Sequence, residues 1–212
     1  MVQVTLCASS LGYLFPQNET QDLRLHSAFK HAVNLYSDAG TFITLLCAQT
    51  YLNLPDAARV WLPECWDWRR EIAHSDPIQL TQGLLRTPRF CVALENATLW
   101  QSPFVGRMLT LEAFPLVFQH YPTMASQRLL FCLEHNVQST LHLPDSLTHH
   151  LERALQGHFS EPICQLLAQL VGSASAMTIA SCAEQVMQFG ATSGVDCLAG
   201  MLHGFRTLNT MN

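Results

Sequence analysis

Two groups of residues have types and spacings suited to binding an anion. The first lies between two apolar patterns, in the stretch from 188 to 204, QFGATSGVDCLAGMLHG, and consists of Gly190, Thr192, Ser193, Gly194 and Asp196. A serine followed three residues later by an acid is typical of a helix start. The first amides of a helix carry a positive partial charge that can hold phosphate or carboxylate. An ordinary turn between two helices explains the same residues, so both interpretations stay open.

The second group is Lys30 with Asn34, in the stretch SAFKHAVNL. Regular alternation along a strand places both on one face, between alanines that leave room around them. Asn34 can donate and accept hydrogen bonds, so the pair is suited to a carboxylate or a carbamoyl group. A solvated strand lysine is the simpler interpretation.

The remaining reactive residue types form no recognisable site. His26 and His31 are expected on opposite faces of a strand, and on a helix the rings of His149 and His150 would point about 100° apart, which suits no shared metal. The chain lacks the G-x-S-x-G, P-loop, G-x-G-x-x-G and H-E-x-x-H motifs. We therefore expect no metal and no cofactor, and the sequence identifies no catalytic residue.

Composition limits the classes of protein. The 212 residues are 49% hydrophobic and 13% charged, with a net charge of −5 and no basic run, which disfavours nucleic-acid and polybasic membrane surfaces. Eight cysteines are scattered singly, as expected for reduced, buried thiols in a cytoplasmic protein. No run approaches the roughly 18 apolar residues that a membrane span needs. So few charges predict an apolar surface covered by another subunit.

These residues need a scaffold, and the first half of the chain reads as strands. Two extended segments surround Ser37 to Gly40, a stretch suited to a hairpin turn. Alternation in the first segment predicts one apolar face, made by Leu25, Phe29, Val33 and Leu35. Further strands are expected near 58–62 and 89–94, on either side of WLPECWDWRRE, which predicts a packed loop or a short helix.

The second half has helical periodicity. Helices are predicted at 144–157, 160–172 and 176–188, with a last one after Ser193 and a segment broken by prolines at 108–136. The fold class expected is α+β, with a β-rich domain (barrel-like or a sandwich) at 1–105 and a helical bundle of at least four helices at 106–212.

The sequence resembles the AllH family. SAFKHAVNL with GTFITLL is similar to its N-terminal signature, and FGATSGVDCLAGMLHG is similar to its C-terminal motif, with ALQGHFSEPICQLLAQL between them. The resemblance implies a subunit of an oxamate carbamoyltransferase, which converts oxalurate and phosphate to oxamate and carbamoyl phosphate beside FdrA-like and AllG-like subunits. It transfers to Ser27, Lys30, Asn34, Gly190, Thr192, Ser193, Gly194 and Asp196, without individual roles, and we expect the two motifs to lie together.

One departure from the family matters. A Gly-Leu-Thr-Pro motif ending in two acids is usual in the middle of its members, and nothing between Ala97 and Ser160 matches it. The leading hypothesis is a carbamoyltransferase subunit that holds an anionic group at 190–196, with Lys30 helping to neutralise it. The alternative is a non-catalytic accessory, scaffold or regulatory protein derived from this family. Either one is expected to associate with FdrA-like and AllG-like subunits or with itself.

Overall fold

The computed structural model describes residues 3–102, 149, 153–154, 156–171, 174–189 and 193–210. Two compact units divide the chain. One comprises Met1–Pro103 with His158–Glu161, and the other comprises Phe104–Gly157 with Pro162–Asn212. Residues 103–148 lie outside the described part, so the boundary expected at 105 stays a prediction.

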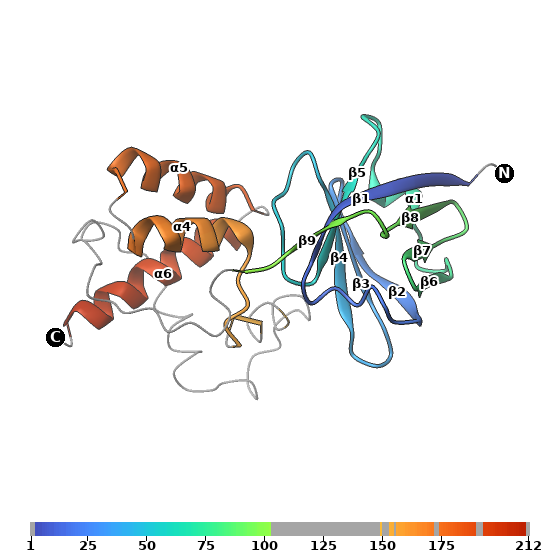
Figure 1. The fold of residues 1–212 in the computed structure, drawn as a ribbon, viewed down its shortest axis with the longest axis horizontal. Helices are drawn as coiled ribbons and strands as arrows, with labels where there is room; N and C mark the ends of the chain where they lie inside the picture. The colour runs from blue at the N-terminus through green and yellow to red at the C-terminus, as the bar shows by residue number, and fades with distance from the viewer. Residues whose placement is uncertain are drawn as a thin grey trace. The chain divides into compact units, whose positions relative to one another are not determined.

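The first unit is a closed β-barrel (Figure 1). Around the barrel the strands follow the order β1, β5, β4, β3, β2, β6, β7, β8 and back to β1. A further strand, β9, pairs in parallel with the last residues of β1. The strands are β1 Val4–Gly12, β2 Gln21–Ala28, β3 Ala32–Tyr36, β4 Phe42–Cys47, β5 Ala57–Trp61, β6 Ile78–Thr81, β7 Leu84–Arg86, β8 Phe90–Ala93 and β9 Thr98–Trp100.

Alternate side chains of these strands fill the barrel. On β3, Val33 and Leu35 are fully buried, while their neighbours along the strand are only half-buried. This pattern is what a small barrel requires, because every second residue points inward and the interior must be packed. The structure therefore confirms the α+β class, and the β-rich half is a barrel.

One part of the predicted strand pattern is wrong. The segment before Ser37 is two strands, joined by a tight turn in which the amide of Phe29 donates to the carbonyl of Ala32 at 2.8 Å. Phe29 is 55% exposed and does not share the apolar face. Lys30 lies in this turn, so it does not alternate with Asn34 on one strand. The hairpin turn that ends at Gly40 is confirmed, and Gly40 has the positive φ of 86° that favours glycine there.

The tryptophan-rich stretch forms the short helix α1, Trp68–Glu71. Trp66, Trp68 and Phe90 pack edge to face, with ring centroids 5.4–5.5 Å apart. Among the described atoms, the buried indole nitrogens of Trp66 and Trp68 have no hydrogen-bond partner.

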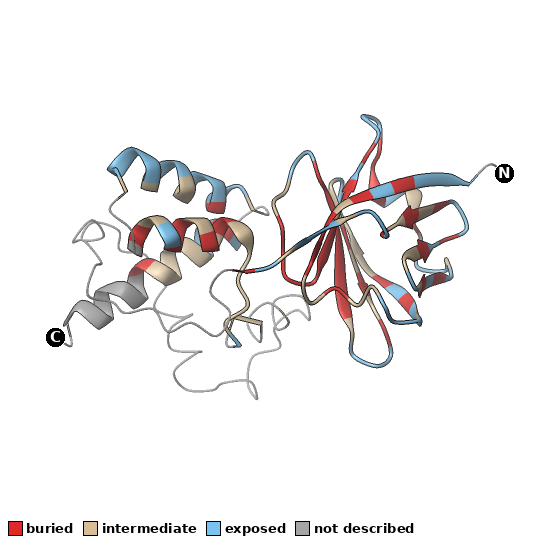
Figure 2. Ribbon diagram, viewed as in Figure 1, coloured by how far each residue is buried: buried red, intermediate tan, exposed pale blue. Residues whose placement is uncertain are grey.

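Three further helices are α4 Glu161–Val171, α5 Ala176–Met187 and α6 Ser193–Thr210, and all their residues except Glu161 belong to the second unit. Their shared core is Leu166, Leu170 and Val186. The hydroxyl of Ser175 caps α5 by accepting from the amide of Thr178 at 3.2 Å. Most of α5 is exposed (Figure 2).

The helices expected at 160–172 and 176–188 are confirmed, together with the one after Ser193. The segment expected to be helical at 108–136 and most of 144–157 lie outside the described residues, so a bundle of at least four helices is not confirmed. Within the described part of the chain, no helix has the length and apolarity to cross a membrane.

Candidate functional site

A β-bulge in β2 brings two neighbouring polar residues to one face of the barrel. Leu25 pairs with Leu35 on β3, but Ser27 pairs with Asn34, so His26 is an extra residue in β2. Successive strand residues normally point to opposite faces, and a bulge changes this locally. The ring of His26 packs against the outward-facing rings of Tyr36 and Phe42, at centroid distances of 6.2 and 5.4 Å. His26 and Ser27 therefore both lie on the outer face.

A chain of hydrogen bonds connects these residues across three strands. The Thr44 hydroxyl donates to Oδ1 of Asn34 at 2.9 Å, and Nδ2 of Asn34 donates to Oγ of Ser27 at 3.0 Å. Ser27 Oγ is also 3.0 Å from Nδ1 of His26. We call His26, Ser27, Asn34 and Thr44 the bulge cluster. Thr44 is 4% exposed and the other members are half-buried.

The bulge cluster has the chemistry of an uncharged polar site. Because Thr44 donates to Oδ1, the amide of Asn34 is oriented with its donor toward Ser27. Ser27 accepts that bond and retains its own proton for a further acceptor. Such an array of hydroxyl, amide and imidazole groups suits a ligand that has both N–H and C=O groups.

Of the three site residues expected in the barrel, the structure brings Ser27 and Asn34 into contact, whereas Lys30 lies in the following turn. Ser27 and Asn34 are in direct contact. Lys30 is exposed in the turn between β2 and β3, and its carbonyl accepts from the amide of Trp68 at 3.4 Å. Its ammonium group is thus a surface charge three residues from Ser27.

The helix start at α6 differs from what we expected. Gly190 and Thr192 lie outside the described residues. The Gly194 amide, expected to be free for an anion, donates to the carbonyl of Phe189 at 2.9 Å. A Cβ on Gly194 would lie 1.9 Å from the carbonyl oxygen of Val186. Gly194 is therefore needed for the close approach of α6 to the end of α5, and its amide is not an anion donor.

The other described residues of this motif are at the surface. Ser193 and Asp196 are exposed in the first turn of α6. They belong to the helical unit, whereas the bulge cluster belongs to the barrel. A site shared by both motifs therefore stays a prediction.

Sequence reasoning missed a second polar cluster, which attaches residues 158–161 to the barrel. Oε2 of Glu161 accepts from the amide and from Nδ2 of Asn53, at 2.9 and 2.7 Å, and Ser10 donates to Oδ1 of Asn53 at 2.6 Å. The Tyr13 hydroxyl lies 2.7 Å from Nδ1 of His158. No sequence signal links these residues, since the partners are more than 40 positions apart. Their mutual bonds indicate a structural role.

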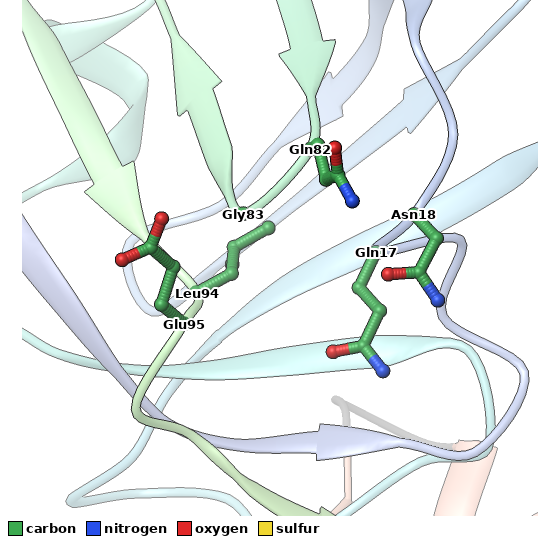
Figure 3. Close-up of a pocket in the computed structure, with 6 residues that line it drawn as sticks. All are labelled: Gln17, Asn18, Gln82, Gly83, Leu94 and Glu95. Carbon is green, nitrogen blue, oxygen red and sulfur yellow. The ribbon is translucent and has the colours of Figure 1, made fainter.

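A hollow of about 400 Å³ lies elsewhere on the barrel (Figure 3). Its polar lining comes from the carboxamides of Gln17, Asn18 and Gln82, with Glu95 on the other side of Gly83 (Figure 3). A carboxylate and three neutral amides do not favour an anion, and none of these residues belongs to the motifs. The hollow is therefore a poorer candidate than the bulge cluster.

The cysteines partly contradict the expectation of buried thiols. All described cysteines are free, but Cys7 and Cys65 are exposed. Cys7 is on the outer face of β1, opposite the exposed Trp61 of β5, so an apolar sequence context did not mean burial. Burial raises the pKa of the Cys197 thiol, which keeps it protonated and unreactive. Among the described residues, no group of three histidine, cysteine or acidic side chains is placed to hold a metal.

The fold and the site define a protein with a barrel unit, a helical unit and a polar cluster at a bulge of the barrel. Comparison with family models gives a specific assignment. The model of the AllH family N-terminal domain matches residues 4–99, and the model of the oxamate carbamoyltransferase subunit AllH matches residues 105–205. The chain therefore belongs to the AllH family. Being a subunit implies an assembly of several chains.

No curated protein and no solved structure matches the chain. The family assignment thus rests on the two family models, which match consecutive parts of the chain in the same order as the motifs.

Proposed function

We propose that this chain is the AllH subunit of a cytoplasmic oxamate carbamoyltransferase, which converts oxalurate and phosphate to oxamate and carbamoyl phosphate. The observation that carries the proposal is the match of residues 105–205 to the family model of that subunit. FdrA-like and AllG-like chains are the proposed partners, and self-association is the alternative assembly. The proposed role is to bind the substrate and to contribute groups that stabilise the charge developing during transfer.

The bulge cluster supports this role through its chemistry. The carbamoyl group that is transferred carries an N–H₂ group and a carbonyl, which match the acceptors and donors of Ser27, Asn34 and His26. Oxalurate also carries a carboxylate, and phosphate is an anion. Lys30 supplies positive charge in the adjoining turn.

The C-terminal motif keeps a proposed role in anion binding, but without Gly194. We propose that Gly190, Thr192, Ser193 and Asp196 form the rim of an anion site at the start of α6. Gly194 has a packing role there, because its amide is already bonded to Phe189. The donors for an anion must then come from the other residues of the motif.

The rival proposal is a non-catalytic accessory or regulatory subunit. The missing Gly-Leu-Thr-Pro and acidic motif between Ala97 and Ser160 favours it. Both proposals require association with the partner chains, but only the first requires that the chemistry depend on this chain.

Reconstitution separates the two proposals. The chain is co-expressed with the FdrA-like and AllG-like chains, and carbamoyl phosphate is measured from oxalurate and phosphate with and without it. We expect formation only when it is present. An assembly that is equally active without it would overturn the catalytic proposal, and co-purification in that case would favour the accessory role.

A matched pair of variants tests Lys30 in the same assay. Lys30→Met removes an exposed cation in the turn between β2 and β3, and Arg86→Met removes an exposed cation on β7. We expect Lys30→Met to raise the KM for oxalurate about tenfold, which corresponds to about 1.4 kcal/mol of binding energy, with little change for Arg86→Met. Equal effects of the two variants would exclude a specific role for Lys30.

A further inference from the structure

We propose that Ser27 is a nucleophile that accepts the carbamoyl group, with His26 as its general base. The identity of the natural donor rests on the proposed function, but the reactivity of Ser27 does not. Ser27 would then form a covalent intermediate, and Ser27 and His26 would both be catalytic residues. Nothing in the sequence singles out His26 as a base.

The geometry of the pair is that of an activated hydroxyl. Ser27 Oγ and His26 Nδ1 are 3.0 Å apart, within the range for proton transfer between a nucleophile and its base. A neutral imidazole with its proton on Nε2 presents Nδ1 as an acceptor. Ser27 Oγ already accepts from Asn34, so its own proton is available for His26.

The surroundings hold this geometry in place. The bulge brings His26 to the face of Ser27, and bulges commonly redirect side chains next to active sites. Tyr36 and Phe42 pack edge to face against the imidazole and restrict its rotation. A purely structural polar contact across β2 and β3 would need only Ser27 and Asn34.

The amide of Asn34 is oriented by Thr44 so that it donates to Ser27. Thr44 donates to Oδ1 of Asn34, which orients the amide so that its Nδ2 group donates to Oγ of Ser27, the oxygen that becomes negative when Ser27 loses its proton. Oriented donors of this kind stabilise a developing alkoxide without rearrangement. Asn34 and Thr44 are thus positioning residues for the nucleophile.

The first half-reaction uses a substituted urea, R–NH–CO–NH₂, of which oxalurate is one. Ser27 Oγ attacks the carbamoyl carbon as its proton passes to Nδ1 of His26. The C–N bond to the R–NH group breaks, and His26 passes the proton to the leaving nitrogen. The products are the amide R–NH₂ and a carbamoyl ester on Ser27.

The second half-reaction uses monohydrogen phosphate. An oxygen of phosphate attacks the carbamoyl carbon, and its proton passes through His26 to Ser27 Oγ as the ester bond breaks. The products are carbamoyl phosphate and free Ser27. No oxidation or reduction occurs in either step.

The purified full-length chain is treated with p-nitrophenyl carbamate, an activated carbamoyl donor, and the release of p-nitrophenolate is followed. Peptide mass spectrometry then locates the added carbamoyl group, which separates Ser27 from Lys30 and the exposed thiols of Cys7 and Cys65. We expect the label on Ser27 and none at that position in Ser27→Ala.

His26→Phe keeps an aromatic ring but removes the base, and His26→Asn is a smaller variant in case the first does not fold. Either should slow labelling of Ser27 about 100-fold, the scale of general base catalysis. Ser9→Ala is the matched control, because Ser9 donates to a carbonyl on β5 and has no histidine contact in the described residues. It should leave labelling of Ser27 unchanged.

The absence of label on Ser27 in the folded chain would overturn the proposal. Equal labelling rates in wild type and in a folded His26 variant would also overturn it, because His26 would then not be the base. Labelling of Ser27 without oxalurate turnover in the assembly would retain the nucleophile and refute the proposed function. Oxalurate turnover without labelling of Ser27 would support the proposed function and refute Ser27 as the nucleophile.

Discussion

The bulge cluster and the start of α6 both carry family motif residues, but the residues are used differently. At the bulge, the side chains of Ser27 and Asn34 bond to each other and to neighbouring polar groups. At the start of α6, Gly194 is constrained by its backbone, which bonds to Phe189 and lies against Val186. A motif position can therefore serve side-chain hydrogen bonding in one case and close packing in the other, and residue type alone does not separate them.

The largest effect expected from this difference is on stability at Gly194. The Cβ of Gly194→Ala would lie 1.9 Å from a backbone oxygen, so α5 and α6 must move apart. We expect a loss of about 3 kcal/mol in the free energy of unfolding, the upper end for overpacking. Urea denaturation of the full chain measures it.

Gly157→Ala is the control for Gly194→Ala. Gly157 has a φ of 82°, and no atom of the described residues lies within 4 Å of the position of an added Cβ, so we expect alanine to meet mainly backbone strain, about 1 kcal/mol. Ser27 labelling should be unchanged in both variants. Equal losses of stability would show that the contact with Val186 does not constrain Gly194.

The second prediction concerns Glu161, whose side chain bonds to Asn53 and so attaches residues 158–161 to the barrel. In Glu161→Ala, the buried amide of Asn53 loses its charged acceptor, and we expect a loss of about 2 kcal/mol in the free energy of unfolding. Glu184→Ala removes an exposed acid of α5 and should change stability by less than about 0.5 kcal/mol. Indistinguishable unfolding curves for the two variants would show that the Asn53 contact contributes nothing.

A smaller loss of stability is expected at the bulge itself. Asn34→Ala removes the bonds to the half-buried Ser27 and to the buried Thr44, which should cost about 1 kcal/mol. Labelling of Ser27 should nevertheless fall about tenfold, because the nucleophile loses its oriented donor. Asn34→Ala should thus lose little stability and much labelling, whereas Gly194→Ala should lose much stability and no labelling. Unfolding and labelling of the same samples measure both effects. Normal labelling in Asn34→Ala would remove Asn34 from the reactive array.

Much of the fold follows from local sequence signals. The turn at Gly40, the strands β5 and β8, and the helices α5 and α6 all have local signatures in residue type and period. The closure of the barrel could not be predicted, because it depends on the pairing of β1 with β5 and β8, more than 40 positions away. Strand pairings of that range leave no local pattern.

The candidate site was predictable only in part. Ser27 and Asn34 lay in a motif, but the partnership of Ser27 with His26 depends on a bulge that breaks the alternation we assumed. The same assumption placed Phe29 inside and Lys30 on a strand, where the chain instead turns. The role of Gly194 depends on Val186, whose carbonyl position only the packed helices determine.

Helix starts provide the last comparison, because α1 is capped by a charged side chain. The Asp67 carboxylate accepts from the amide and the guanidinium of Arg69, at 3.1 Å and at 2.9 and 2.6 Å. These bonds lower the pKa of Asp67 from 3.8 to about 2. A group with a lowered pKa in the folded state contributes stability above its unfolded pKa and loses it on protonation.

The contribution of Asp67 should therefore be complete above about pH 4 and should disappear as the pH falls toward 2. Asp67→Asn keeps a cap of similar shape that does not titrate, so its stability should decline less over this interval than that of the wild type. Asp38→Asn is the comparison variant, because Asp38 pairs with Arg24 at an exposed site. Thermal unfolding from pH 2 to 7 gives the three profiles. Parallel profiles for wild type and Asp67→Asn would mean that the charge of Asp67 does not stabilise the helix start, and that α1, like α6, depends on its backbone and packing.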